Sequence, residues 1–369
     1  MSVSDGVRAI SADSHVNPPP DMWAEYLPAE FRDRAPVVER TPEGDFEVFE
    51  GRRRPMTGLL AAAGRRPQEY TMTVRRFDEV RPGGWSPQPR VEDQDIDGID
   101  AEVLFGTSGD PLRSGDPALA RASHTAYNHW LADFCAYAPK RLVGIAYIPA
   151  IDPDDSLAEI RDAAAHGLRG ALLPKSPASG AWGDDAWAPV WHKLVELDWP
   201  ANFHVGGSPL GLAASSGSAG PSAFFTSMVA TKFQMPLTLG ELVMGGVLNR
   251  HPELKVVSVE GQIGWIPFWK YYLDHAYEKH RWHRNVHFDE LPSYYIDRQV
   301  FYTFMEDPPG IEVRHRCGVD RIMWSNDYPH SETTWPNSQK IIDETFENVP
   351  AAEIRRIVRD NCVDLYHLG

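Results

Sequence analysis

Short apolar segments recur along the chain, and most of them precede a longer segment with the spacing of an amphipathic helix. Eight of them have the length and composition of buried strands, at 9–13, 101–106, 142–147, 170–174, 201–205, 256–260, 300–304 and 322–324. Helices are predicted at 116–138, 156–166, 187–197, 222–249, 267–280 and 311–317, and closing helices at 338–368. Strands that alternate with helices indicate a parallel sheet with crossover connections.

Eight strand–helix units are the number found in a (β/α)8 TIM barrel, which is the α/β fold predicted here. An open, doubly wound sheet is the alternative, but no Gly-x-Gly-x-x-Gly follows the first strand and no Walker loop occurs. We expect one barrel domain over residues 1–369, with an insertion at about 17–92 that rims the mouth and a C-terminal helical segment at about 338–369.

The composition narrows the class of protein. With 42% hydrophobic residues and no apolar run long enough to cross a bilayer, the chain is typical of a soluble globular protein. Its net charge of −16 argues against nucleic acid or an anionic membrane as partner. Three widely spaced cysteines and no signal-peptide pattern predict a cytoplasmic protein without a disulfide framework or a cysteine-based zinc site.

Residues that can bind a metal follow four of the predicted strands. Because the carboxyl ends of parallel barrel strands meet at one mouth, we expect these side chains to lie together. Alternate residues of a strand point to the same side, so Asp13 and His15 at the end of the first strand can reach one ion. The predicted ligands are Asp13, His15, His204, Glu260, Asp327 and His330.

These residues carry a resemblance to the amidohydrolase superfamily, in the branch that contains decarboxylases. The matching segments are Asp-Ser-His at 13–15, His204 and Ser-Asn-Asp-Tyr-Pro-His at 325–330, with support from 92–100 and 167–170. The resemblance covers nearly the whole chain and implies a barrel of the metal-dependent hydrolase type, with a divalent metal at its mouth.

The chain departs from that superfamily pattern at two places. Asp13 stands where relatives usually begin a His-x-His pair, and Glu260 stands where they usually carry a histidine. Three carboxylates and three imidazoles are also more than one ion normally takes from a protein that leaves a reactive position open. A set without thiolate suits iron or manganese better than zinc.

With these departures, the chain most resembles the TIM-barrel nonheme diiron monooxygenases of platensimycin and platencin biosynthesis. This resemblance implies an oxidoreductase of secondary metabolism, with two Fe ions, O2 as co-substrate, an external electron donor and a homodimer. It would hydroxylate a coenzyme A thioester, with a diterpenoid acyl group as one candidate, and Asp327 and Glu260 would be the catalytic residues.

A mononuclear metal-dependent decarboxylase or hydrolase is the alternative. One Zn or Mn would then polarise the substrate or lower the pKa of bound water, and Asp327 would be both ligand and general base. A non-catalytic barrel that binds metal only for stability ranks lowest.

The first insertion is rich in arginine, and Arg52, Arg53 and Arg54 are predicted to bind the phosphates of coenzyme A. An equally good interpretation is that these arginines lie on a solvated surface loop and bind no ligand. Trp265 is a candidate for contact with an apolar acyl group. Lys175 and Glu306 follow strands and are further candidates, whereas His124 is predicted to pack between helices.

Overall fold

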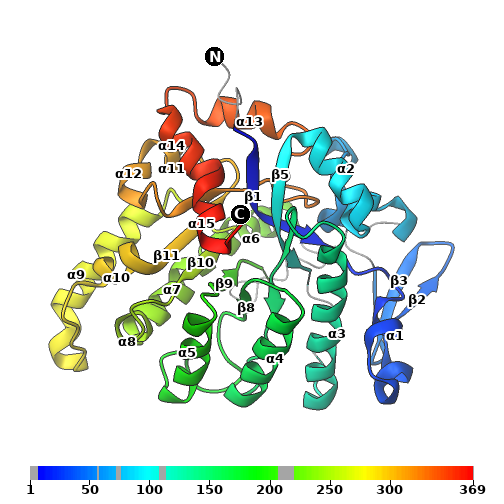
Figure 1. Ribbon diagram of the computed structural model, residues 1–369, viewed down its shortest axis with the longest axis horizontal. Coiled ribbons are helices and arrows are strands. Elements are labelled where there is room, and N and C mark those ends of the chain that lie inside the picture. The colour runs from blue at the N-terminus through cyan, green and yellow to red at the C-terminus, as the bar shows by residue number, and fades with distance from the viewer. Residues whose placement is uncertain (1–6, 56–57, 72–75, 108–113, 207–219, 369) are drawn as a thin grey trace.

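The computed structural model describes residues 7–55, 58–71, 76–107, 114–206 and 220–368. Its centre is a ring of parallel strands surrounded by helices (Figure 1). The strands of this ring are β1 (Ala9–Val16), β5 (Ile99–Gly106), β6 (Leu142–Gly144), β7 (Ala146–Tyr147), β8 (Ala171–Leu173), β9 (Ala201–His204), β10 (Val256–Val259), β11 (Val300–Phe304) and β12 (Ile322–Trp324).

Hydrogen bonds close these strands into a barrel. They form one sheet in the order β1-β5-β6 and another in the order β12-β11-β10-β9-β8-β7. β6 and β7 are two halves of one barrel strand, because Ile145 N between them donates to Leu104 O on one side (3.0 Å) and Ala146 N donates to Gly170 O on the other (2.9 Å). Asp327 N donates to Asp13 O (3.1 Å) and joins the last strand to the first. The predicted (β/α)8 barrel is confirmed.

Helices connect the strands and cover the outside of the barrel. They are α1 (Met22–Tyr26), α2 (Pro87–Asp97), α3 (Pro117–Ala136), α4 (Pro153–Ala165), α5 (Ala188–Glu196), α6 (Pro221–Lys232), α7 (Gln234–Met244), α8 (Val247–Arg250), α9 (Ile266–Arg284), α10 (Pro292–Gln299), α11 (Pro308–Glu312), α12 (Arg314–Cys317), α13 (Ser338–Thr345), α14 (Ala351–Arg355) and α15 (Asn361–Tyr366). Several begin with a side-chain cap, as where Asp116 Oδ1 accepts from Ala118 N at the start of α3 (2.9 Å).

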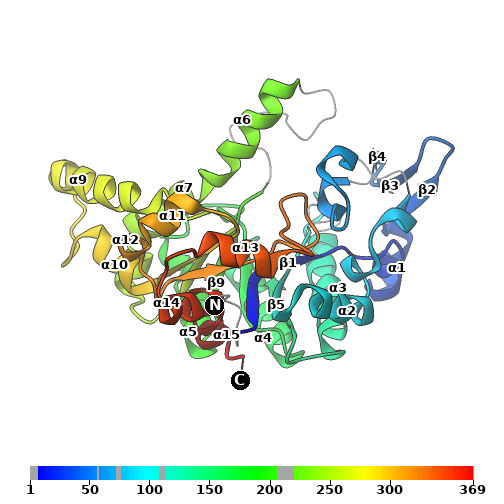
Figure 2. The same ribbon diagram turned by 90° about the horizontal axis from the view of Figure 1, so that it is seen from above.

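The predicted helix at 222–249 is three helices in the structure. The chain turns at Phe233, between α6 and α7, and again at Gly246, whose φ of 76° lies in the left-handed region. As a result α6 projects from the body of the molecule (Figure 2).

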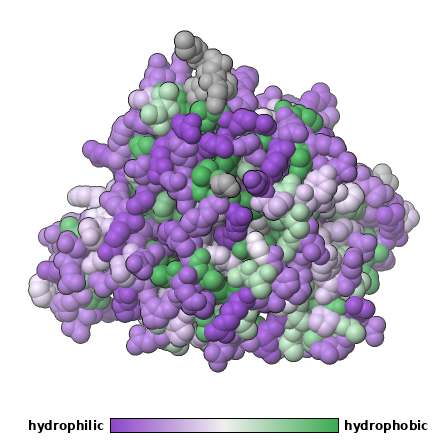
Figure 3. All heavy atoms as spheres, in the orientation of Figure 1, coloured by the Kyte–Doolittle hydropathy of each residue, from purple (hydrophilic) through white to green (hydrophobic). Residues whose placement is uncertain are grey.

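The insertion after β1 contains a small antiparallel sheet of β2 (Val37–Arg40), β3 (Asp45–Phe49) and β4 (Arg52–Pro55). This sheet projects from the same side of the molecule as α6 (Figure 2). The face shown in Figure 3 is mostly hydrophilic, with apolar residues scattered between charged ones. No helix in the described part of the chain is long and apolar enough to cross a membrane.

A buried ion pair fixes the insertion to the barrel beside the end of β1. Arg90 on α2 is fully buried, and its Nε donates to Glu102 Oε2 on β5 at 2.5 Å. The same guanidinium donates to the carbonyl oxygens of His15 (2.8 Å) and Gly83 (3.0 Å). Arg90 therefore holds the strand end that carries a predicted metal ligand.

Candidate metal centre

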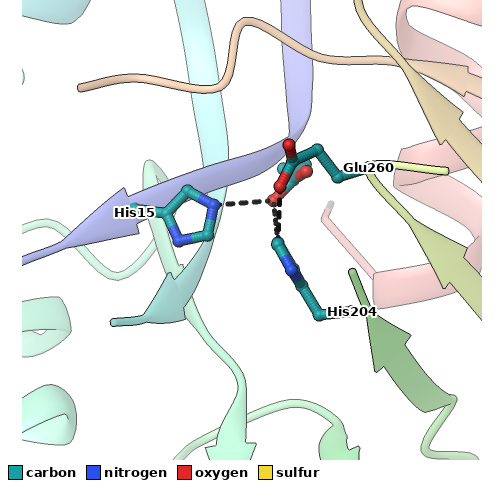
Figure 4. Close-up of side chains that lie close together, drawn as sticks. His15, His204 and Glu260 are labelled. Carbon is teal, nitrogen blue, oxygen red and sulfur yellow. Dashed lines mark hydrogen bonds and ion pairs between the residues drawn. The ribbon is translucent and has the colours of Figure 1, made fainter. Parts of the chain in front are cut away.

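The structure brings all six predicted metal ligands together at the carboxyl ends of the strands. They come from β1 (Asp13, His15), β9 (His204), the residue after β10 (Glu260) and the loop after β12 (Asp327, His330). They form two groups of four that share His15 and Glu260, and in each group the potential ligand atoms lie within 4.8 Å of one another. Figure 4 shows His15, His204 and Glu260 pointing toward one another from their three elements.

The imidazoles of this cluster lie between its carboxylates. His15 Nε2 is 3.3 Å from Asp327 Oδ1 and 3.5 Å from Asp13 Oδ1. His204 Nε2 is 3.4 Å from Asp13 Oδ1 and 3.6 Å from Glu260 Oε2. The cluster is deeply placed, with exposed fractions of 0% for Asp13, 2% for His15 and 1% for Asp327.

Two of the carboxylates stand on strained backbone. Glu260 has a φ of 60° and Asp327 a φ of 52°, in the left-handed region that residues other than glycine rarely adopt. Glu260 N donates to Thr303 Oγ1 (2.7 Å) and Asp327 N to Asp13 O (3.1 Å), and these bonds hold the conformation. Strain of this kind, on the order of 1–3 kcal/mol per residue, typically occurs at functional sites.

A buried hydrogen-bond network connects β1 to the loop after β12. Asn326 Oδ1 accepts from Ser14 Oγ (2.8 Å), Ser11 Oγ (3.0 Å) and Tyr328 N (3.1 Å). Ser14 and Asn326 lie inside the two segments on which the sequence prediction rests, but their spacing gave no sign of this pairing. The network fixes Asp13 and Asp327 relative to each other.

Lys232 is a cluster residue that the sequence did not reveal, since it lies in α6 without a distinctive motif. Its Nζ donates to Glu260 Oε1 (2.7 Å) and to Glu332 Oε2 (2.8 Å). Burial opposes the ionised form of Glu260, but the ammonium of Lys232, together with the charges of His204 and His330, outweighs it and lowers the pKa of this carboxyl. Glu260 thus offers one free oxygen to the cluster, on the side of His204.

The three imidazoles differ in their affinity for protons. Burial, aided by His330, holds the pKa of His15 well below its ordinary value. Burial also disfavours the charged form of His204, but Asp13 and Glu260 outweigh it and raise its pKa to about 9. The pKa of His330 is also raised, because Asp327 Oδ1 lies 3.1 Å from its Nδ1 and outweighs burial.

The cluster fits a bound cation. Burying a polar atom without a hydrogen bond is unfavourable, and within the described part of the chain several such atoms gather here. They are Asp13 Oδ2, both ring nitrogens of His15, both carboxylate oxygens of Asp327 and Nε2 of His330. With neutral imidazoles, the form that binds a metal, the cluster stays negative, because Lys232 offsets only one of three carboxylate charges. Carboxylate and imidazole ligands without thiolate suit manganese, iron or zinc.

The cluster opens into a cavity of about 800 Å³. All of its members except Asp13 line this cavity, as do Lys232 and Lys175. Lys175 Nζ donates to Gly206 O. His124, predicted to pack between helices, also lines the cavity from α3.

The predicted substrate-binding residues lie elsewhere. Arg52, Arg53 and Arg54 are exposed on β4, where Arg53 Nε donates to Glu39 Oε2 at 2.7 Å. Trp265 Nε1 donates to Gly261 O (2.8 Å), and the indole packs on Trp269 and Tyr302. None of these four predicted residues is among those that line the cavity, and neither is Glu306, which is exposed.

Comparison with known proteins places the chain in a family. Residues 12–368 match the sequence model of the family described as amidohydrolase. The chain belongs to the amidohydrolase family. A curated relative, the gamma-resorcylate decarboxylase of Rhodococcus jostii, is 25% identical over 302 residues, which are 74% of this chain and 85% of the relative.

Solved structures show the same amidohydrolase fold. An amidohydrolase from Mycobacterium avium subsp. paratuberculosis has a TM-score of 0.80 and 24% identity, over 99% of this chain and 100% of that one. A 5-carboxyvanillate decarboxylase from Novosphingobium aromaticivorans has a TM-score of 0.72 and 19% identity, and the match covers 100% of this chain and 98% of that enzyme. That enzyme was crystallised with manganese and 4-hydroxy-3-methoxy-5-nitrobenzoic acid.

The prediction of a nonheme diiron monooxygenase is wrong, because the curated relatives of this amidohydrolase are decarboxylases. The oxidoreductase chemistry, two irons, O2, the electron donor and hydroxylation of an acyl-CoA are withdrawn with it. The prediction took Glu260, which stands where relatives usually carry a histidine, as a metal ligand and catalytic residue that favoured iron and oxygen chemistry. In the structure one of its oxygens is paired with Lys232 instead. The alternative, a metal-dependent decarboxylase, is favoured.

Proposed function

We propose that this protein is a decarboxylase of aromatic carboxylic acids that uses one divalent metal ion, with manganese the best candidate. The observation that carries the proposal is the buried cluster of carboxylates and imidazoles, with unpaired polar atoms, at the floor of a cavity. The relationship to gamma-resorcylate decarboxylase and the manganese in the carboxyvanillate decarboxylase support the reaction and the metal.

The first group of four, Asp13, His15, His204 and Glu260, would hold the ion. When bound, a divalent ion acts as a Lewis acid that attracts the substrate carboxylate and a neighbouring oxygen. Lys232 keeps Glu260 ionised and fixes the direction of its free oxygen toward His204.

Asp327 and His330 would supply the proton that replaces the carboxyl group. As the carbon–carbon bond breaks, its electron pair stays on the ring carbon, CO2 leaves, and the ring carbon takes a proton that starts on His330 and passes through Asp327. His330 Nδ1, 3.1 Å from Asp327 Oδ1, holds a proton that restores the protonated acid. The raised pKa of His330 keeps its ring protonated near neutral pH, so this proton is present before the carbon–carbon bond breaks.

Release of CO2 from carboxyl-labelled acids tests the proposal. Protein stripped of metal and reloaded with Mn2+ is incubated with dihydroxybenzoates and carboxyvanillate, and labelled CO2 is counted. We expect release from at least one acid, and a loss of about 100-fold or more in Asp327→Asn. Asp162→Asn, on the outer helix α4, is the control that keeps full activity. Manganese-loaded protein that releases no CO2 from any of these acids would overturn the proposal.

Three expectations from the sequence are kept as predictions. These are the single domain over residues 1–369, the homodimer and the cytoplasmic location. Size-exclusion chromatography with light scattering tests the dimer, with a mass near twice 41.4 kDa expected.

A further inference from the structure

The cavity has two chemically different parts. Its floor carries the metal cluster and Lys232, whereas much of its remaining wall is aliphatic and includes Ile148, Ile151, Leu172, Leu173, Val205 and Met228. A volume of about 800 Å³ lies in the upper part of the roughly 300–1,000 Å³ range of pockets that enclose drug-sized ligands. A single-ring acid bound at the cluster would leave most of this wall in contact with water.

His124 places one polar atom in this cavity. It lies on α3 and is 7% exposed. Its Nδ1 is 2.7 Å from Ala120 O, and since a carbonyl oxygen only accepts, Nδ1 carries the hydrogen. In the neutral ring Nε2 is therefore an acceptor, and no described residue donates to it.

The ring of His124 stays neutral at ordinary pH. Burial lowers its pKa to about 4, against the smaller opposing effect of the bond to Ala120 O. Within the described part of the chain, the ring of His124 contacts the ring of Tyr147 edge-on, with centroids 5.7 Å apart. Nε2 is not among the buried atoms that lack a partner in the described part of the chain, so it is accessible from the cavity, where a ligand can donate to it.

We propose that the substrate is an aromatic acid with an apolar body larger than one ring, which contacts the aliphatic wall and donates a hydrogen bond from a hydroxyl or N–H group to His124 Nε2. This inference rests on the proposed decarboxylase function, because the metal cluster is taken to bind the carboxylate. His124 then determines which of several similar acids is accepted, since a site built to pair with a hydroxyl rejects analogues that lack it.

Calorimetric binding of a series of acids to the manganese-loaded protein tests the proposal. The series is benzoate, biphenyl-4-carboxylate, and biphenyl-4-carboxylates with a hydroxyl at the 2′, 3′ or 4′ position. We expect biphenyl-4-carboxylate to bind at least tenfold more tightly than benzoate, because it buries a second ring. One of the three hydroxylated isomers should bind about tenfold more tightly than biphenyl-4-carboxylate itself.

Two variants distinguish recognition of the hydroxyl group by His124 from packing of the ligand's rings against the cavity wall. His124→Leu should remove the advantage of the hydroxylated isomer and leave the affinity for biphenyl-4-carboxylate within about twofold. His129→Leu, on the same helix but paired with Asp162 outside the cavity, is the matched control and should change neither affinity. Thermal melting confirms that both variants are folded, and the comparison of acids in the unaltered protein does not depend on either variant.

The proposal is overturned if the biphenyl acids bind no better than benzoate, or if no hydroxylated isomer gains affinity through His124. Failure here is distinct from failure of the decarboxylase proposal. Release of CO2 from single-ring acids would support that proposal even if the larger acids did not bind. Hydroxyl-dependent binding without CO2 release from any acid would support the recognition site and contradict the reaction.

Discussion

At the scale of single residues, the centre depends on His15, which belongs to both groups of potential ligands. Its ring stacks on that of His330, with centroids 3.7 Å apart, and contacts the ring of His204 edge-on at 4.9 Å. Neither ring nitrogen has a hydrogen-bond partner in the described chain, although the side chain is almost completely buried. Burying two ring nitrogens without partners is unfavourable, and a bound metal ion would supply a partner for one of them.

His15→Ala should therefore abolish stable metal binding. We expect manganese retained after gel filtration to fall from near one equivalent per chain to less than a tenth, because a lost ligand weakens affinity by about 100-fold or more. Elemental analysis measures it. His367→Ala, which removes an exposed histidine paired with Asp198 at 2.9 Å, should retain the full amount. Equal manganese in both variants would contradict the site.

His204 makes metal binding depend on pH. With its pKa raised to about 9 in the metal-free protein, Nε2 carries a proton at neutral pH that an incoming ion must displace. The apparent affinity for Mn2+ should therefore rise about tenfold per pH unit up to about pH 9 and then level off. Competition with a chromophoric chelator between pH 6.5 and 9.5 measures this slope, and a constant affinity over this range would refute it.

The sequence brought together the right candidate residues because metal-capable side chains at the ends of parallel strands must meet at one mouth. Asp13 and His204, 191 residues apart, are in contact for that reason. Lys232 and His124 could not be found in this way, since both lie on helices whose orientation toward the cavity depends on packing. The error in function arose at Glu260, whose pairing with Lys232 is a tertiary contact.

At the scale of elements, α2 and β5 are joined by the buried pair of Arg90 and Glu102. Arg90→Met would leave Glu102 buried without its counter-ion and release the carbonyl of His15. We expect the free energy of unfolding to fall by about 3–5 kcal/mol, measured by urea denaturation.

A surface ion pair of the insertion provides the control for this prediction. Arg53 and Glu39 pair at 2.7 Å, but their side chains are 45% and 50% exposed. Arg53→Met should therefore change the free energy of unfolding by less than about 1 kcal/mol. Similar losses in the two variants would show that burial of the Arg90 pair has no special effect.

Whether the buried residues of an element are apolar or polar explains which elements the sequence could predict. Barrel strands are apolar on both faces, so their segments stand out. Helix α2 was not predicted, because its buried residues are Arg90, Asp93, Gln94 and Asp97, which a search for apolar periodicity does not detect. These polar residues are satisfied by tertiary partners, as where Tyr328 Oη donates to Asp93 Oδ2 at 2.6 Å.

At the scale of the whole molecule, the barrel sets where chemistry takes place and leaves open what that chemistry is. The order and number of strands followed from hydrophobic pattern alone. The reaction did not, because one set of carboxylates and imidazoles suits several metals and several reactions. Membership of the amidohydrolase family is shown, and the decarboxylase relatives favour one of these reactions, which is proposed above.

We expect that one divalent ion at this cluster supports decarboxylation. Titration of metal-free protein with Mn2+, with CO2 release measured at each addition, tests it most directly. We predict that the rate is near zero without metal, rises linearly and becomes constant at one equivalent per chain. A break at two equivalents, or an equal rate without metal, would contradict the account.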